Sequence, residues 1–326
     1  MTALLKVKNL KTYFFIDKKV IRAVDGVDIE INKGETVALV GESGSGKSMT
    51  SLSVMKLIPN PPGKIVDGQI LFDGVDLLPL PEDKMYRVRG NAISMIFQEP
   101  MTSLNPVLTI GEQITEVLIY HKKLSKKEAA AKAVELLKMV GFSRAKEMMN
   151  DYPHRLSGGM RQRVMIAIAM SCNPKLLIAD EPTTALDVTI QAQILDIMKD
   201  LNENFGTSIL LITHDLGVVS EIADKVLVMY CGQVVEESPV DDLFDEPLHP
   251  YTIGLLKSIP SIDHDTGKLI PVQGNIPSPE NFPKGCRFAP RCPHVFDRCL
   301  AESPHLINVD TDRSVRCFLY DNKGDE

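Results

Sequence analysis

One stretch of eight residues restricts what this chain can fold into more than any other. Residues 41–48 read GESGSGKS, directly after the apolar run TVALV and directly before a segment with helical spacing, Lys47 to Ile58. Glycines let successive backbone N–H groups turn inward around a chain of phosphates, and the helix that follows adds its positive N-terminal end. The sequence therefore predicts a phosphate-binding loop between a strand and a helix.

The residues of this loop have separate expected roles. Lys47 supplies a positive charge to the β- and γ-phosphates of a nucleotide, and the Ser48 hydroxyl is a ligand for Mg²⁺. The remaining contacts come from the backbone and side chains of the loop and the first helical turn. The predicted nucleotide-binding residues here are Gly41, Ser43, Gly44, Ser45, Gly46, Lys47, Ser48 and Met49.

The rest of the chain supports an α/β fold. Residues 4–40 read as strands, residues 100–160 as helices, and strand and helix patterns alternate again from KLLIAD at 175 to KVLVMYCGQVVEE at 225. Such alternation predicts a mostly parallel sheet with helices on its faces. The segment GKIVDGQILFDGVDL is read as a hairpin with turn signals at 67–68 and 73–74, and a helix is expected from Ser125, capped by Glu128, to Gly141.

An acidic pair follows a second apolar strand. In KLLIADEP, residues 175–182, Asp180 is placed to hold Mg²⁺, directly or through water. Glu181, one residue further on, can orient or deprotonate an attacking water. Together with the loop at 41–48, this pair predicts a nucleotide-hydrolysing site.

The segment LSGGMRQR, residues 156–163, identifies the class. Ser157 can cap a helix, and Gly158 and Gly159 leave backbone N–H groups open to an anion. With the motifs above, this set resembles the ATP-binding subunits of ABC transporters. The resemblance implies a P-loop NTPase fold with a mostly parallel core, an antiparallel β subdomain and a helical subdomain. It also implies that this helix end meets the γ-phosphate held by a second subunit.

Further positions match the family's motifs one at a time. Gln98 in IFQEP matches a glutamine that touches Mg²⁺ and senses the membrane partner, and His214 in LLITHD matches a histidine near the γ-phosphate. Asp187 in ALD matches a loop that crosses the dimer. Tyr13 is the candidate aromatic for stacking on adenine. The resemblance thus implies Glu181, His214 and Gln98 as catalytic residues.

Several segments resemble the peptide and nickel branch of ABC importers: EPMTSLNPVLTIGEQI, DYPHRLSGGMRQR, EPLHPYTIGLLKSIP and GNIPSPENFPKGCRFAPRCP. This implies an ATPase that powers uptake of dipeptides or oligopeptides, with nickel chelates or glutathione as alternative cargo. The implied partners are a second ATP-binding subunit, identical or paralogous, two transmembrane permease subunits and, indirectly, an external solute-binding protein. The expected location is the cytoplasmic face of the membrane, without insertion.

Composition agrees with these expectations. The net charge of −7 argues against a nucleic-acid partner. The N-terminus has no signal-peptide pattern, and the longest apolar run, Val164 to Cys172, has nine residues, fewer than the roughly 18 that span a bilayer. Composition shifts towards Pro, Gly and Cys after residue 246. We therefore expect an ATP-binding domain at 1–246, with its helical subdomain at about 100–165, and a C-terminal extension at 247–326.

Four of the six cysteines lie in this extension, at positions 286, 292, 299 and 317. Thiolates that converge repel one another and need a cation or cluster to neutralise them, and a tetrathiolate site can hold Zn²⁺ or a [4Fe–4S] cluster. The spacing lacks the C-x2-C pair of zinc ribbons. Arg287, Arg291, Arg298 and Arg316 flank the cysteines and could offset the charge of an anionic cluster. The resemblance implies a [4Fe–4S] cluster on Cys286, Cys292, Cys299 and Cys317.

Two other functions have to be weighed. A soluble ABC-type protein of DNA repair or of the ribosome would carry long coiled coils or two cassettes, and this chain has one cassette and no sustained heptads. An iron–sulfur regulator would not need the intact Asp180, Glu181 and His214. We also expect the cysteine site to be structural, so that Cys292→Ser loosens the extension and leaves nucleotide binding intact.

Overall fold

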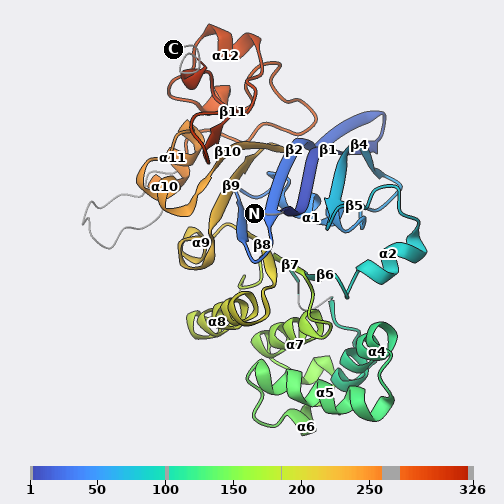
Figure 1. Cartoon of the computed structure of the whole chain (residues 1–326). Coiled ribbons are helices and arrows are strands. Elements are labelled where there is room, and N and C mark those ends of the chain that lie inside the picture. Colours follow the sequence, from blue (N-terminus) through green and yellow to red (C-terminus); the bar gives the residue numbers. More distant parts are fainter. Residues whose placement is uncertain (1–2, 100–102, 185, 259–271, 322–326) are drawn as a thin grey trace. The chain divides into compact units, whose positions relative to one another are not determined.

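In a computed structural model, residues 3–99, 103–184, 186–258 and 272–321 are described, and the chain forms two compact units (Figure 1). Unit 1 comprises Met1–Leu4, Ile31–Thr36 and Pro79–Ile212, and unit 2 comprises Leu5–Glu30, Val37–Leu78 and Thr213–Glu326. Both units combine segments that are far apart in the sequence. The division expected at residue 246 stays a prediction.

Unit 2 contains an antiparallel sheet in the order β2-β1-β4-β5 and a second run of strands in the order β11-β12-β10-β9-β3. In the second run β3 and β9 are parallel, whereas β10 is antiparallel to β9 and β12. The strands are β1 (Ala3–Ile16), β2 (Lys19–Asn32), β3 (Thr36–Val40), β4 (Gly63–Phe72), β5 (Val75–Asp76), β9 (Lys225–Tyr230), β10 (Gln233–Pro239), β11 (Ile307–Asn308) and β12 (Ser314–Val315). Its helices are α1 (Lys47–Val54), α9 (Leu216–Ile222), α10 (Val240–Asp245), α11 (Pro250–Lys257) and α12 (Asp297–Ala301).

Unit 1 contains a parallel run of strands, in the order β8-β7-β6. These are β6 (Ile93–Ile96), β7 (Leu176–Asp180) and β8 (Ser208–Thr213), and the helices are α2 (Glu82–Val88), α4 (Ile110–Lys122), α5 (Lys126–Met139), α6 (Ala145–Met148), α7 (Gly158–Met170) and α8 (Val188–Phe205). Helices α4, α5 and α7 pack on one another, in green in Figure 1. They form the helical region that the sequence predicts.

The strands that lead to the predicted motifs are buried along their whole length. Every residue of β3, β7 and β8 is buried. Continuous apolar runs of this kind are typical of parallel strands covered on both faces, whereas strands with one wet face alternate. The predicted α/β fold, with its mostly parallel core and its antiparallel subdomain, is confirmed.

The predicted turn at Asp67-Gly68 is wrong. Strand β4 continues through both residues, and only Asp73-Gly74 forms the turn to β5. At Asp67 the pairing of β4 with β1 shifts register, and the Asp67 carboxylate accepts hydrogen bonds from Lys11 and Asn9 across the pair. Gly68 has a φ of 111°, and a Cβ there would lie 2.7 Å from Leu10 Cα. The Asp-Gly pair therefore makes a β-bulge rather than a turn.

The predicted start of helix α5 is confirmed. Ser125 is its N-cap, Glu128 N donates to Ser125 Oγ at 3.3 Å, and Ser125 N donates to Glu128 Oε2 at 2.9 Å. The same reciprocal capping box joins Thr109 and Glu112 at the start of α4. In both cases two amides that no helical carbonyl can reach are satisfied.

Within the described residues, no helix combines the length and the apolar character that a membrane crossing requires.

Removing the α5 cap tests this reading of the helical region. Ser125→Ala should cost about 1 kcal/mol of local stability, because the Glu128 amide loses its acceptor. Hydrogen exchange of residues 126–129 should speed up accordingly. Lys132→Ala, which removes only an exposed ion pair with Glu135, is the matched control. Unchanged exchange in Ser125→Ala would show that the cap does not hold the helix start.

Candidate functional site

The loop at 41–48 joins β3 to α1 in unit 2, as the sequence predicts. Its base is packed closely against β9, because a Cβ at Gly41 would lie 2.2 Å from the Met229 carbonyl oxygen. Gly232 N also donates to Ser45 O at 2.8 Å, which fixes the middle of the loop. Ser43 and Gly44 are exposed at the tip, and a Cβ on Gly44 would meet nothing within 4 Å. The loop is therefore anchored at its base and open at its tip.

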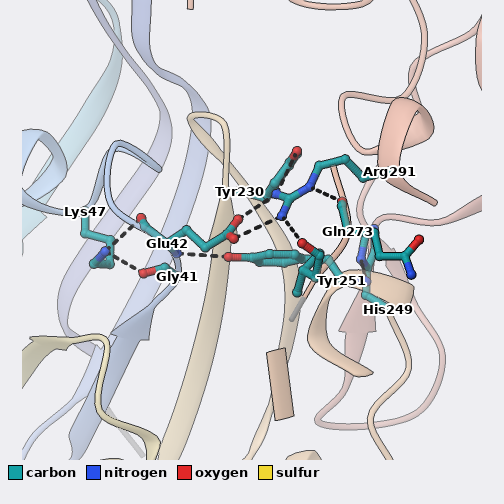
Figure 2. Close-up of polar contacts among 9 residues, drawn as sticks. Gly41, Glu42, Lys47, Tyr230, His249, Tyr251, Gln273 and Arg291 are labelled. Atoms are coloured by element: carbon teal, nitrogen blue, oxygen red, sulfur yellow. Dashed lines mark hydrogen bonds and ion pairs between the residues drawn. The ribbon is translucent and has the colours of Figure 1, made fainter. Parts of the chain in front are cut away.

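The Lys47 side chain points into the loop with which it is predicted to bind phosphates. The residue is 5% exposed, and its Nζ donates to Gly41 O at 2.7 Å and to Glu42 O at 3.1 Å (Figure 2). Ser48 and Met49 follow in the first turn of α1, and the Ser45 side chain is buried with no hydrogen bond to its Oγ among the described residues. The loop therefore presents an ammonium group and a helix start beside its open tip, the chemistry that binds phosphates.

Asp180 and Glu181 follow each other at the end of β7 in unit 1. Asp180 is the last residue of the strand and is 4% exposed. Glu181 has a φ of 48°, which is unusual for a residue other than glycine and is often found at functional sites. Its Oε2 accepts hydrogen bonds from Gln98 Nε2 and Thr184 Oγ1, both at 3.0 Å. The Glu181 carboxylate is thus held in a defined orientation.

Gln98 and Glu181 meet because β6 and β7 are parallel neighbours, so the segments that follow their carboxyl ends lie at the same edge. That edge is where ligands bind in open α/β sheets. The structure brings these two predicted catalytic residues together.

Helix α7 begins at the predicted signature. Ser157 is its N-cap and accepts a hydrogen bond from Met160 N at 3.3 Å, and both Ser157 and Gly158 are exposed. Asp187 caps α8 in the same way, through Ile190 N at 2.9 Å. A Cβ on Gly159 would lie 3.0 Å from Ile190 Cγ2, so the two helix starts are in contact. An exposed helix start with open amides is suited to an anion brought by another molecule.

Gln162, which the sequence analysis did not single out, links this helix to Glu181. It is 2% exposed, and its Nε2 donates to Pro182 O at 2.7 Å. The buried amide therefore ties α7 to the residue that follows Glu181.

Two predicted residues lie elsewhere in unit 2. His214 is exposed directly after β8. The Tyr13 hydroxyl on β1 donates to Asp25 Oδ1 at 2.6 Å, and burial together with this bond to an acidic partner raises the pKa of Tyr13 to about 12. Tyr13 is therefore neutral. The role of Tyr13 in stacking on adenine and the role of His214 near a phosphate stay predictions.

The four cysteines of the extension line one small cavity, together with His249, His294, Phe288 and Phe318. All are free thiols, and Cys286 N donates to Cys299 O at 2.8 Å. Burial raises the pKa of Cys286, Cys292 and Cys317, and neighbouring thiols raise it further. Among the residues that the structure describes, however, no group of three or more His, Cys, Asp or Glu side chains has the arrangement of a metal site. The iron–sulfur centre stays a prediction.

The arginines around these cysteines have other partners than expected. Arg287 pairs with Asp25 and also donates to Cys231 O, and Arg291 pairs with Glu42 of the phosphate loop. Arg298 pairs with Glu302 and Asp321. Arg316 donates to the carbonyls of Val234 and Pro304. The charges of Arg287, Arg291 and Arg298 are therefore already balanced by carboxylates.

Sequence reasoning missed the residues that hold the base of the phosphate loop. Glu42 N donates to Tyr251 Oη at 2.9 Å, and Arg291 binds the Glu42 carboxylate through two nitrogens (Figure 2). The His-Pro-Tyr of EPLHPYTIGLL was visible in the sequence. Nothing local connects it to a loop 209 residues away.

Comparison with known proteins agrees with this geometry. The family model described as "ABC transporter" matches residues 24–184, and that described as "Oligopeptide/dipeptide transporter, C-terminal region" matches residues 235–299. The oligopeptide transport ATP-binding protein AppD of Bacillus subtilis is 68% identical over 326 residues, covering 100% of this chain and 99% of that protein. The dipeptide transport ATP-binding protein DppD of the same organism is 47% identical, covering 100% and 97%.

Solved structures show the same fold. The ATP-binding cassette MJ0796, solved as a dimer in a post-hydrolysis state bound to ADP and Pi, has a TM-score of 0.66 and 32% identity, covering 72% of this chain and 98% of that one. CbiO1 from Clostridium perfringens, described as part of the ABC transporter complex cbiONQ, has a TM-score of 0.63 and 27% identity, covering 76% and 92%.

The close packing of Gly41 gives a prediction for stability. Gly41→Ala should lower the stability of the chain by about 2–3 kcal/mol, because the added Cβ meets a backbone carbonyl that cannot rotate away. Gly158→Ala is the matched control for unfolding, since nothing lies within 4 Å of its Cβ position. Thermal unfolding of both variants is the measurement. Equal unfolding temperatures would show that the loop base tolerates a side chain.

Proposed function

This chain belongs to the ATP-binding proteins of the ABC transporter family, and we propose that its ATP hydrolysis powers the uptake of oligopeptides or dipeptides through a membrane importer. The observation that carries the proposal is the identity of 68% to an oligopeptide transport ATP-binding protein over the whole chain. The match of residues 235–299 to the oligopeptide/dipeptide C-terminal region supports peptides as cargo. The chain is an ATPase coupled to transport.

We further propose how the site residues divide the work. Backbone amides of residues 41–48 and the Lys47 ammonium bind the phosphates, and Tyr13 stacks on adenine. Glu181, oriented by Gln98 and Thr184, holds the attacking water and accepts its proton. His214 contacts the γ-phosphate. Orientation of the Glu181 carboxylate before reaction is what supports its role as the base.

The residues present fit a magnesium ion. Ser48, Gln98 and Asp180 offer hydroxyl, amide and carboxylate oxygens, the ligands that Mg²⁺ prefers. Asp180 is almost fully buried, and a nearby cation stabilises the charged form of a buried carboxylate. When bound, Mg²⁺ neutralises charge on the β- and γ-phosphate oxygens.

The signature helix supports a second subunit as partner. Ser157, Gly158 and Asp187 are exposed at adjoining helix starts, where they can receive the γ-phosphate of a nucleotide bound to another ATP-binding subunit. We propose that this partner is a copy of the chain or a paralogue, and that the pair binds two permease subunits at the cytoplasmic face of the membrane. Closing and parting of the pair would then drive the permease.

The four-cysteine cavity is proposed to hold a [4Fe–4S] cluster. Four thiols that line one cavity supply the ligand number that such a cluster needs. Burial raises the pKa of Cys286, Cys292 and Cys317, and a bound cation would favour their thiolate forms. Zn²⁺ is the alternative occupant.

Replacing the proposed base tests the hydrolytic mechanism. Glu181→Gln should retain ATP binding and lower kcat by roughly 10²–10⁴-fold, because the amide cannot accept the proton. With ATP and Mg²⁺ the variant should accumulate as a closed pair, measured by light scattering. Asp196→Asn, an exposed change on α8, is the control. Parental turnover in Glu181→Gln would exclude this residue as the base.

Metal analysis tests the cysteine cavity. Protein purified without oxygen should contain about four iron and four sulfide per chain, and Cys299→Ser should lose most of both. Cys172→Ser, which changes a buried thiol in unit 1, should keep them. If the protein contained one zinc per chain and no sulfide, the cavity would be a zinc site and not a cluster site.

A further inference from the structure

A short segment of the extension reaches the phosphate loop. Residues 286–292 read CRFAPRC, so Arg291 directly precedes one of the cavity's cysteines. Arg291 Nη1 lies 2.7 Å from Glu42 Oε2, and its Nη2 lies 3.1 Å from Glu42 Oε1. The Arg291 side chain is 3% exposed and that of Glu42 is 27% exposed. This is a two-point ion pair, mostly shielded from water, between the extension and the second residue of the loop.

Arg291 is itself held on its other side. Its Nε donates to Gln273 O at 2.9 Å, and Nη2 donates to Val272 O at 3.1 Å (Figure 2). Its guanidinium also lies 5.7 Å from the centre of the Tyr230 ring. A guanidinium fixed by two carbonyls presents a rigid fork, and the pair with Glu42 therefore sets where that carboxylate lies.

The His-Pro-Tyr segment makes a second connection to the same loop residue. The His249 ring lines the cysteine cavity, and its Nδ1 accepts from Tyr251 N at 3.0 Å. Tyr251 is fully buried, and its Oη accepts from Glu42 N at 2.9 Å. Its ring packs with those of Tyr230 and Phe288, in a cluster against which Cys286 and Cys292 also pack. The backbone and the side chain of Glu42 are thus both held from the extension.

The charge of Glu42 makes this arrangement matter for nucleotide binding. Lys47 Nζ bonds to Glu42 O, so the Glu42 side chain belongs to the residue next to the predicted phosphate site. An unpaired carboxylate there would repel phosphates and compete with them for Lys47. The pair with Arg291 neutralises that charge and directs it towards the extension.

We propose that Arg291 and Tyr251 are positioning residues for ATP binding that both act through Glu42. Arg291 keeps the Glu42 carboxylate away from the nucleotide, and Tyr251 holds the base of the phosphate loop through the Glu42 amide. This rests on the proposed function, in which the loop binds the phosphates of ATP. It differs from the expectation that the cysteine region and nucleotide binding are independent, because Arg291 directly precedes Cys292 in the chain.

A double-mutant cycle tests the proposal. The dissociation constant for ATP with Mg²⁺ is measured by calorimetry on the full chain and on Arg291→Ala, Glu42→Gln and the double variant. Arg291→Ala should bind ATP roughly tenfold more weakly, as expected for one lost charge-assisted pair. Glu42→Gln should bind nearly as the parent does. The double variant should return to within about threefold of the parent, because no carboxylate is left to repel the phosphates.

The outcomes separate positioning from folding. If the double variant binds as weakly as Arg291→Ala, Arg291 acts only by supporting the extension, and the proposal is overturned. Parental affinity in Arg291→Ala also overturns it. Arg298→Ala, which removes pairs with Glu302 and Asp321 within the extension, should leave affinity unchanged. Lys47→Ala tests the proposed function separately from this inference. If Lys47→Ala binds ATP normally, the loop does not bind the phosphates, and the proposed function fails together with the inference.

A nucleotide-free measurement covers the case in which Arg291→Ala does not fold. Tyr251→Phe keeps the packed ring and removes only the acceptor of the Glu42 amide. Hydrogen exchange of the Glu42 and Ser43 amides should then be at least about threefold faster than in the parent, and the unfolding temperature should change little. Unchanged exchange at Glu42 would show that Tyr251 does not hold the loop.

Discussion

The structure depends above all on how closely the phosphate loop approaches its own scaffold. The absence of a side chain at Gly41 lets the backbone lie against the Met229 carbonyl. The same approach brings Gly232 N to Ser45 O. A loop fixed in this way needs little rearrangement to accept an anion, since its amides and the Lys47 ammonium are already gathered. β3 and β9, which carry this contact, are parallel, and all of β3 and all of β9 after Lys225 are buried.

Much of this could be predicted because the signals are local. The loop, the acidic pair after β7, and the caps at Ser125, Ser157 and Asp187 each depend on a few consecutive residues and on backbone amides that must find partners. The wrong prediction of a turn at Asp67-Gly68 also came from relying on a local signal. An Asp-Gly pair suits both a turn and a bulge, and the choice depends on Lys11 and Asn9 across the sheet.

The contacts of the extension could not be predicted, because they join residues far apart in the chain. Four arginines near four cysteines suggested charge balance within the extension. In the structure Arg287 and Arg291 instead pair with Asp25 and Glu42, more than 200 residues earlier. A basic residue in sequence shows that a charge must be compensated, but only the tertiary fold decides which carboxylate does so. The ring contacts of Tyr230 with Tyr251 and Phe288 could not be predicted for the same reason, since these residues are also far apart in the chain.

The buried bond from Gln162 to Pro182 means that the start of α7 and the segment after β7 cannot move independently. It joins the helix that begins at the exposed residues Ser157 and Gly158 to the residue directly after Glu181. A substitution that shifts the start of α7 would therefore also shift the backbone beside Glu181, even though the substituted residue does not touch that carboxylate.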